Sequence, residues 1–161
     1  MKLITEASAE KLRGGFYTPE PIAEFILRWG INGSKDYDIL EPSCGDGVFL
    51  EQLRNHKLKY NSITAVEFDE IEAQKANKID LKNKQIINDD FHTYCNNTLQ
   101  RFDLIIGNPP YIRYQFFNRN QQIEAGDIFI KAGLTYSKLT NAWVSFVIGS
   151  SLLLKDKGGK I

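Results

Sequence analysis

The chain has 161 residues, and its 20 lysines and arginines balance its 20 aspartates and glutamates, which gives a formal net charge of zero at pH 7. This balance excludes an autonomous, strongly basic module that coats DNA. A hydrophobic content of 42% and a charged content of 25% are typical of one globular domain and unlike a disordered chain.

The sequence offers few residues for metal binding or disulfide bonds. It contains 2 cysteines, Cys44 and Cys95, and 2 histidines, His56 and His92, which are too few and too scattered for a zinc site. We therefore expect no metal and a reduced, cytoplasmic environment. No stretch has the apolar length of a signal peptide or a membrane span, so we expect no membrane contact.

Short β-branched runs alternate with helical patterns, and this alternation predicts an α/β fold with a mostly parallel sheet. The first helix is expected to begin at Thr18 and Pro19, a good cap and first-turn pair, and to end near Gly30. The residues expected on its apolar face recur at helical spacing and are Ile22, Phe25, Ile26 and Trp29.

The other expected elements follow in chain order. Strands are predicted over residues 37–40, 62–66, 85–88 and 103–107, and helices over residues 48–55, 69–79 and 141–154. Residues 112–126 have mixed charge and no clear period, which predicts a mobile loop. The sequence stops at Ile161, where a fifth strand would begin, so we expect a fragment truncated at its C-terminus.

A glycine-rich turn follows the first predicted strand. It places Glu41 at the carboxyl end of a strand, then Gly45 and Gly47, then the amino terminus of a helix. Cofactors bind at this position in open α/β sheets, because glycines let backbone N–H groups approach a carboxylate. The turn departs from the GxGxxG pattern, which weakens the case for a dinucleotide, and such a turn can also be purely structural.

Acidic residues also follow the next two predicted strands. Glu67 lies about 22 residues beyond Gly45, the approximate spacing at which a carboxylate binds ribose hydroxyls. Asp90 and Phe91 offer an acceptor and an aromatic plate, which suit the amine and the ring of an adenine. Each of these positions is equally compatible with an ordinary polar strand end.

The most specific motif is the quartet Asn108-Pro109-Pro110-Tyr111, which directly follows a buried strand. Two consecutive prolines fix φ and give up backbone donors, so this turn presents carbonyl groups rigidly. Asn108 supplies a side-chain carbonyl, Pro109 a backbone carbonyl and Tyr111 a face for stacking. Two acceptors that grip the hydrogens of a planar amine can pull its nitrogen toward tetrahedral geometry and free its lone pair.

Taken together, these motifs resemble the γ-class N6-adenine DNA methyltransferases of bacterial restriction-modification systems. The resemblance rests on residues 14–19, the loop of residues 41–47, Glu67, residues 90–91 and the quartet of residues 108–111. It covers nearly the whole chain and implies a Rossmann-like fold that depends on S-adenosylmethionine. Residues 1–161 would then form the cofactor-binding and catalytic domain, without the later strands and the target-recognition domain.

The resemblance also implies roles for individual residues. Those implied for cofactor binding are Tyr17, Thr18, Glu41, Ser43, Gly45, Glu67, Phe68, Asp90 and Phe91, and those implied for catalysis are Asn108, Pro109, Pro110 and Tyr111. Glu41 would hold the methionine part of S-adenosylmethionine, Glu67 the ribose hydroxyls and Asp90 the adenine amine. Thr18 would close over the cofactor, and Tyr111 would stack on a flipped adenine.

Double-stranded DNA is the implied partner, bound mainly by the missing C-terminal part, together with a fused or separate restriction endonuclease. Two alternatives stay open. One is an amino methyltransferase that uses the same quartet on a protein glutamine or on guanine N2 of ribosomal RNA, although the segment of residues 17–19 argues against it. The other is an inactive fragment that binds the cofactor alone.

Overall fold

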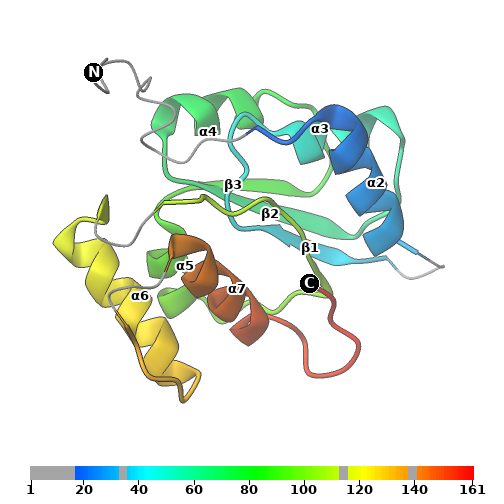
Figure 1. Ribbon diagram of the computed structural model, residues 1–161. Helices are drawn as coiled ribbons and strands as arrows, with labels where there is room; N and C mark the ends of the chain where they lie inside the picture. The colour runs from blue at the N-terminus through cyan, green and yellow to red at the C-terminus, as the bar shows by residue number, and fades with distance from the viewer. Residues whose placement is uncertain (1–16, 33–35, 113–115, 138–140) are drawn as a thin grey trace, which may run out of the picture.

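The computed structural model describes residues 17–32, 36–112, 116–137 and 141–161. Its centre is a four-stranded parallel sheet in the order β3-β2-β1-β4 (Figure 1). The strands are β1 (Asp38–Glu41), β2 (Ser62–Glu67), β3 (Lys84–Asn88) and β4 (Leu104–Ile105). The parallel sheet predicted from the sequence is confirmed, with strand ends within about two residues of those expected.

One layer of helices covers the upper face of the sheet in Figure 1. It consists of α2 (Glu20–Gly30), α3 (Val48–Asn55) and α4 (Glu70–Asn77). The core beneath it is apolar and includes Leu27, Ile39, Phe49, Leu50 and Ile63, all of which are fully buried. Buried strands of a parallel sheet need such cover on both faces, which explains their continuous apolar runs.

A second layer covers the opposite face (Figure 1). It consists of α5 (Phe91–Asn97), α6 (Arg119–Lys131) and α7 (Ala142–Leu152). Its core contains Leu40, Phe91, Ile128 and Leu153. As predicted, Asn141 caps α7, and its side chain accepts from the backbone N–H of Trp143 at 3.4 Å.

The first helix differs from the prediction in its cap and in its buried face. The cap residue is Pro19, which has no side-chain capping bond, so Thr18 does not take that role. The face that packs on the sheet consists of Ala23, Leu27 and Gly30, whereas Phe25 and Trp29 are 70% and 60% exposed. Gly30 allows a close approach to Leu104, because an added methyl group would lie 3.1 Å from Leu104 Cδ1.

The mobile loop predicted over residues 112–126 is wrong from Arg119 on, where α6 begins, and residues 113–115 lie outside the described part of the chain. A capping box starts this helix: Asn118 accepts from Gln121 N, and the Gln121 side chain accepts from Asn118 N. Ala125 and Ile128 are buried on its inner face. The sequence patterns do not predict α5, although Asp90 caps this helix by accepting from His92 N.

Lys160 extends the sheet at the edge of β4. Its N–H donates to Asp103 O at 2.9 Å, and its carbonyl accepts from Ile105 N at 2.9 Å, which forms a parallel bridge where a fifth strand was expected. Within the described part of the chain, the helices are too short or too polar to cross a bilayer.

Candidate active site

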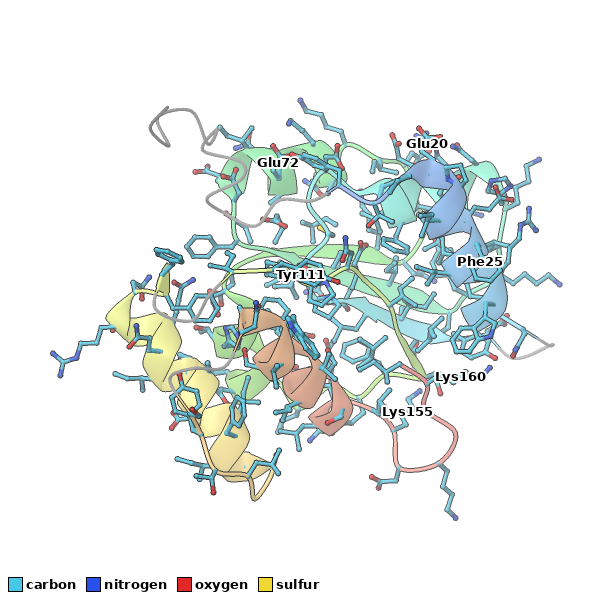
Figure 2. The ribbon with its side chains drawn as sticks, viewed as in Figure 1. Glu20, Phe25, Glu72, Tyr111, Lys155 and Lys160 are labelled. Carbon is cyan, nitrogen blue, oxygen red and sulfur yellow. The ribbon has the colours of Figure 1, made fainter. Side chains whose placement is uncertain are left out.

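The carboxyl ends of the four strands meet at one edge of the sheet and bring the predicted polar residues together. Glu41 ends β1, Glu67 ends β2, Asp90 lies just beyond β3, and Asn108 lies just beyond β4. Parallel strands place their carboxyl ends at the same edge, where ligands bind in open α/β sheets. In Figure 2, Tyr111 lies near the middle of the view, between the two layers of helices.

The glycine-rich loop is tied directly to the end of β2. Gly45 N donates to Glu67 Oε2 at 2.8 Å, and Cys44 N donates to Val66 O at 3.0 Å. The backbone φ angles of Gly45 and Gly47 are +54° and +98°, in a region that favours glycine. These contacts and backbone angles give the loop a defined shape.

Glu67 uses both carboxylate oxygens within the protein. Oε1 accepts from Asp69 N at 2.8 Å, and Oε2 accepts from Gly45 N. Burial raises the pKa of Glu67, and these two backbone hydrogen bonds oppose that rise. Each carboxylate oxygen can accept a second hydrogen bond, so the two contacts leave acceptor positions for a diol.

Glu41 is almost completely buried, with 1% of its surface exposed. Among the described residues, no group hydrogen-bonds to its Oε2 atom. Burial raises the pKa of Glu41 well above its ordinary value, and the nearby charges of Glu67 and Asp46 add to this effect. A buried acidic oxygen without a partner is costly unless a donor reaches it, which fits a site for a cationic or hydrogen-bonding group of a ligand.

A cavity of about 430 Å³ opens beside Glu67 and Asp90. Its walls combine acidic side chains with aromatic rings, among them Phe68, Phe91, Phe116, Phe117 and Phe146. Phe68 is exposed at the rim, whereas Phe91 is buried and stacks on Phe146 with 4.9 Å between ring centroids. A flat aromatic ligand with polar edges suits this lining.

Asp90 lies on the wall of the 430 Å³ cavity, and its carboxylate already has partners within the protein. Oδ1 accepts from His92 N and lies 2.9 Å from His92 Nδ1, and Oδ2 accepts from Gln121 Nε2 at 2.9 Å. Burial acts to raise the pKa of Asp90, but the hydrogen bonds and charge of His92 outweigh it and hold the pKa below its ordinary value. Sequence reasoning missed His92 and Gln121, which come from different helices.

The quartet of residues 108–111 packs against the end of β1. Ser43 Oγ donates to Asn108 O at 3.4 Å, and an added methyl group on Gly107 would lie 3.4 Å from Pro42 Cδ. Pro110 lines the 430 Å³ cavity, and Tyr111 is 56% exposed. The quartet thus lies beside both the cavity and the glycine-rich loop.

A second, mainly apolar cavity of about 290 Å³ is lined by both residues of β4 and by Pro109 of the quartet. Its lining also includes Ser43, together with Trp29 from α2 and Phe146 from α7. The quartet therefore contributes to the lining of both cavities, Pro110 to the first and Pro109 to the second.

The remaining predicted residues lie close to this region. Tyr17 is half-exposed, and an added methyl group on Gly45 would lie 3.8 Å from its Cε1 atom, so Tyr17 borders the loop. Thr18 follows it and is partly buried. Cys44 is buried, and burial raises the pKa of its thiol far above the ordinary value, which fits a packing residue and not a nucleophile.

Comparison with known proteins adds to this geometry. The family model described as N-6 DNA methylase matches residues 2–160. The chain belongs to this family. The structure is similar to a solved structure from Listeria monocytogenes, which is described as a class I S-adenosylmethionine-dependent methyltransferase. The TM-score is 0.62 at 17% identity, over 84% of this chain and 41% of that one, which shows a shared Rossmann-like methyltransferase fold.

Two relatives from Haemophilus influenzae are similar in sequence to this N-6 DNA methylase family member. The Type II methyltransferase M.HincII is 33% identical over 146 residues, which cover 90% of this chain and 26% of the relative. The tRNA1(Val) (adenine(37)-N6)-methyltransferase is 34% identical over 92 residues, which cover 54% of this chain and 40% of the relative. The chain thus spans about a quarter of the length of M.HincII.

Proposed function

We propose that this chain is the cofactor-binding and catalytic domain of an enzyme that transfers a methyl group from S-adenosylmethionine to N6 of adenine in DNA. The observation that carries the proposal is the position of the Asn108–Tyr111 quartet, which lies between the glycine-rich loop and the 430 Å³ cavity. Membership of the N-6 DNA methylase family and likeness to M.HincII support the choice of DNA adenine.

The residues present fit S-adenosylmethionine. Glu41 Oε2, which is buried and has no hydrogen-bond partner among the described residues, suits the ammonium of the methionine part, and the remaining acceptor positions of Glu67 suit the ribose hydroxyls. The cavity between Phe68 and Asp90 suits the adenine ring. Tyr17 and Thr18 are proposed to close over the ligand beside Gly45. When bound, S-adenosylmethionine supplies an electrophilic methyl group.

The quartet is proposed to prepare the acceptor amine. The side-chain carbonyl of Asn108 and the backbone carbonyl of Pro109 would accept the two hydrogens of N6, which draws the nitrogen out of conjugation with the ring. Pro110 keeps the turn rigid. Because N6 of a paired adenine is hidden in the duplex, the base has to leave the stack, and the exposed ring of Tyr111 offers a replacement stacking face.

DNA contacts outside this domain are proposed to lie in the rest of the complete protein, because the chain has a net charge of zero. We also propose a restriction endonuclease, fused or separate, that recognises the same DNA sequence, and a cytoplasmic site of action on bacterial DNA. The likeness to a Type II methyltransferase from Haemophilus influenzae supports the bacterial setting.

A second candidate function is N6 methylation of adenine in RNA. The likeness to the tRNA1(Val) (adenine(37)-N6)-methyltransferase favours it, although that likeness covers a smaller share of this chain than the likeness to M.HincII. The chemistry at the quartet would be the same, and the nucleic acid would differ. Protein glutamine and guanine N2 of ribosomal RNA are further substrates to be tested against these two.

A substrate panel tests the proposal. The complete protein is incubated with S-adenosylmethionine labelled in its methyl group and with duplex DNA, tRNA, ribosomal RNA or a glutamine-containing release factor. Mass spectrometry of the digested products then locates the label. We expect N6-methyldeoxyadenosine from DNA. Label that enters only RNA or protein contradicts DNA as the substrate, and the 161-residue chain assayed alone shows whether this part suffices for turnover.

A further inference from the structure

A line of hydrogen-bonded side chains runs behind the carboxylate of Asp90. His92 Nδ1 lies 2.9 Å from Asp90 Oδ1, and His92 Nε2 lies 2.7 Å from Ser145 Oγ. Ser145 Oγ in turn donates to Ala142 O at 2.7 Å, and Gln121 Nε2 donates to Asp90 Oδ2 at 2.9 Å. The line therefore joins α5, α6 and α7 to one carboxylate on the cavity wall.

The contacts of Asp90 fill its two oxygens unequally. Oδ1 takes two contacts from one residue, the N–H of His92 at 2.8 Å and the ring Nδ1 at 2.9 Å, whereas Oδ2 takes one from Gln121. A carboxylate offers about four acceptor positions, two on each oxygen. Among the described contacts, the position left for a ligand is therefore on Oδ2.

The His92 ring is held firmly in this arrangement. It is 0% exposed and packs edge-on against Phe146 and Phe117, with 4.9 Å and 5.5 Å between ring centroids. A buried imidazole with a polar partner on each nitrogen and aromatic rings around it has little freedom to turn. The Nδ1 contact consequently fixes the rotation of the Asp90 carboxylate.

We propose that His92 is a positioning residue that fills Oδ1 of Asp90 and so aims the remaining acceptor of Oδ2 at the exocyclic amine of the cofactor's purine ring. This inference rests on the proposed function, in which Asp90 receives the adenine of S-adenosylmethionine. A ring with a keto group at the same position presents an acceptor to the carboxylate and is rejected. Selectivity for adenine over hypoxanthine thus depends on His92, which does not itself contact the ligand.

Two amide substitutions separate the two ring nitrogens of His92. The amide of Asn lies about as far from the backbone as Nδ1, and the amide of Gln lies about as far as Nε2. His92→Asn therefore keeps a side-chain donor for Asp90 and loses Ser145, whereas His92→Gln keeps Ser145 and loses the side-chain contact with Oδ1. The backbone N–H of residue 92 can donate to Oδ1 in both variants. Ser145→Ala removes the anchor behind the ring and serves as a third, milder variant.

Calorimetry with the complete protein measures the affinities for S-adenosylhomocysteine and S-inosylhomocysteine, which differ in the 6-amino and 6-keto groups. We expect the wild type to prefer the amino form by roughly ten- to a hundredfold. His92→Asn should keep most of this preference, and His92→Gln should lower it about tenfold. Ser145→Ala should lower it by a smaller factor, which provides the test if His92→Gln fails to fold.

Three outcomes overturn the inference, and the third also contradicts the proposed function. If all variants weaken both ligands equally and leave the preference unchanged, His92 has a structural role only. If His92→Asn loses as much preference as His92→Gln, the Nδ1 contact does not set the selectivity. A wild-type protein that binds neither ligand, or binds both alike, contradicts the cofactor assignment of the proposed function itself.

Discussion

At the scale of single residues, Glu67 both shapes the glycine-rich loop and lines the cavity. Its Oε2 atom accepts from Gly45 N, and its position at the end of β2 places it on the cavity wall. A residue that holds the loop and also faces the ligand affects binding in two ways. The loss of its side chain removes a ligand contact and releases the loop that presents other contacts.

We predict that Glu67→Ala lowers the affinity for S-adenosylhomocysteine by about ten- to a hundredfold, because hydrogen bonds to a charged group contribute about 1.5–3 kcal/mol each. Glu70→Ala is the control, since Glu70 is exposed on α4 and contacts Gln74. Calorimetry on both variants measures the difference. Equal affinities for Glu67→Ala and the wild type would remove Glu67 from the site.

Glu41 should make the stability of the ligand-free protein depend on pH. Burial, with the charges of Glu67 and Asp46, raises its pKa in the folded state. A raised pKa means that the stabilising contribution is complete below the unfolded pKa and is lost as the pH rises through the folded pKa. Glu41→Gln is a neutral substitute of nearly the same shape and lacks this loss.

We therefore expect Glu41→Gln to be more stable than the wild type. This difference in stability should grow as the pH rises from the unfolded pKa to the raised folded pKa of Glu41, and it should be complete above the folded pKa. Denaturant unfolding at several pH values measures the two free energies of unfolding. The effects of Glu67 and Asp46 occur in both proteins and largely cancel. If the free energies of unfolding of the two proteins differ by the same amount at every pH, Glu41 keeps an ordinary pKa.

At the scale of the elements, the start of α3 depends on a close fit against α4. Gly47 caps α3 with a φ of +98°, and an added methyl group would lie 2.5 Å from Ile79 Cδ1, just after α4, and 3.3 Å from Ala76 Cα within α4. Gly133, after α6, also has a positive φ of +70°, but apart from its chain neighbours no described residue has an atom within 4 Å of an added methyl group. A substitution at Gly133 thus tests backbone strain alone, whereas a substitution at Gly47 tests strain together with overpacking.

We predict that Gly47→Ala destabilises the chain by about 2–4 kcal/mol, the sum of left-handed strain and overpacking. Gly133→Ala should cost only about 1 kcal/mol, because strain acts there alone. Thermal unfolding of both variants provides the comparison. A similar loss for both would mean that α4 moves to accommodate the extra methyl group and that the loop has no tight fit.

Local sequence signals predicted some elements well and others poorly, for physical reasons. The strands and the loop at Gly45 were predictable because each has its own short-range pattern. The buried face of α2 was not, because this helix carries apolar residues on both sides, and tertiary packing selected Ala23 and Leu27. The capping box of Asn118 and Gln121 would have indicated α6 despite its weak apolar pattern.

The candidate site shows the same division. Glu41, Glu67 and Asn108 could be placed together from the sequence, because each directly follows a parallel strand. His92 and Gln121 could not, because their contacts with Asp90 depend on how α5 and α6 pack. No local pattern distinguishes such a histidine from any other buried one.

At the scale of the whole molecule, Lys155, which follows α7, forms ion pairs at the amino ends of β1 and β4. Its Nζ atom lies 2.8 Å from Asp38 Oδ2 and 2.7 Å from Asp103 Oδ2. Figure 2 shows it away from Tyr111, at the other end of the sheet. Burial acts to raise the pKa of Asp38, but hydrogen bonds from Lys155, Ser62 and Asn61 hold it below its ordinary value.

We predict that Lys155→Met destabilises the fold by about 2 kcal/mol, because it removes an ammonium from the buried Asp103 carboxylate. The loss is smaller than for a fully buried pair, since the Lys155 side chain is 38% exposed. Lys157→Met, at an exposed position nearby, should change stability by less than about 0.5 kcal/mol. Urea unfolding of both variants is the measurement, and equal stabilities would show that the pair contributes nothing.

The pH dependence of this contact has a definite sign. A depressed pKa of Asp38 means that its stabilising contribution is present above the unfolded pKa and is lost as the pH falls through the folded pKa. The difference in stability between the wild type and Lys155→Met should therefore shrink in acid. The Glu41→Gln difference also shrinks in acid, but there the variant is the more stable protein.

Single-turnover methylation by Asn108→Ala tests most directly the claim that the quartet binds the target amine beside the cofactor. The complete protein and this variant are mixed with duplex DNA and labelled S-adenosylmethionine, and their cofactor affinities are measured in parallel. We predict a methyl-transfer rate lower by about 10²–10³, with nearly unchanged cofactor affinity, because one preorganised acceptor of the amine is lost. Methylation at the wild-type rate would contradict the role of the quartet.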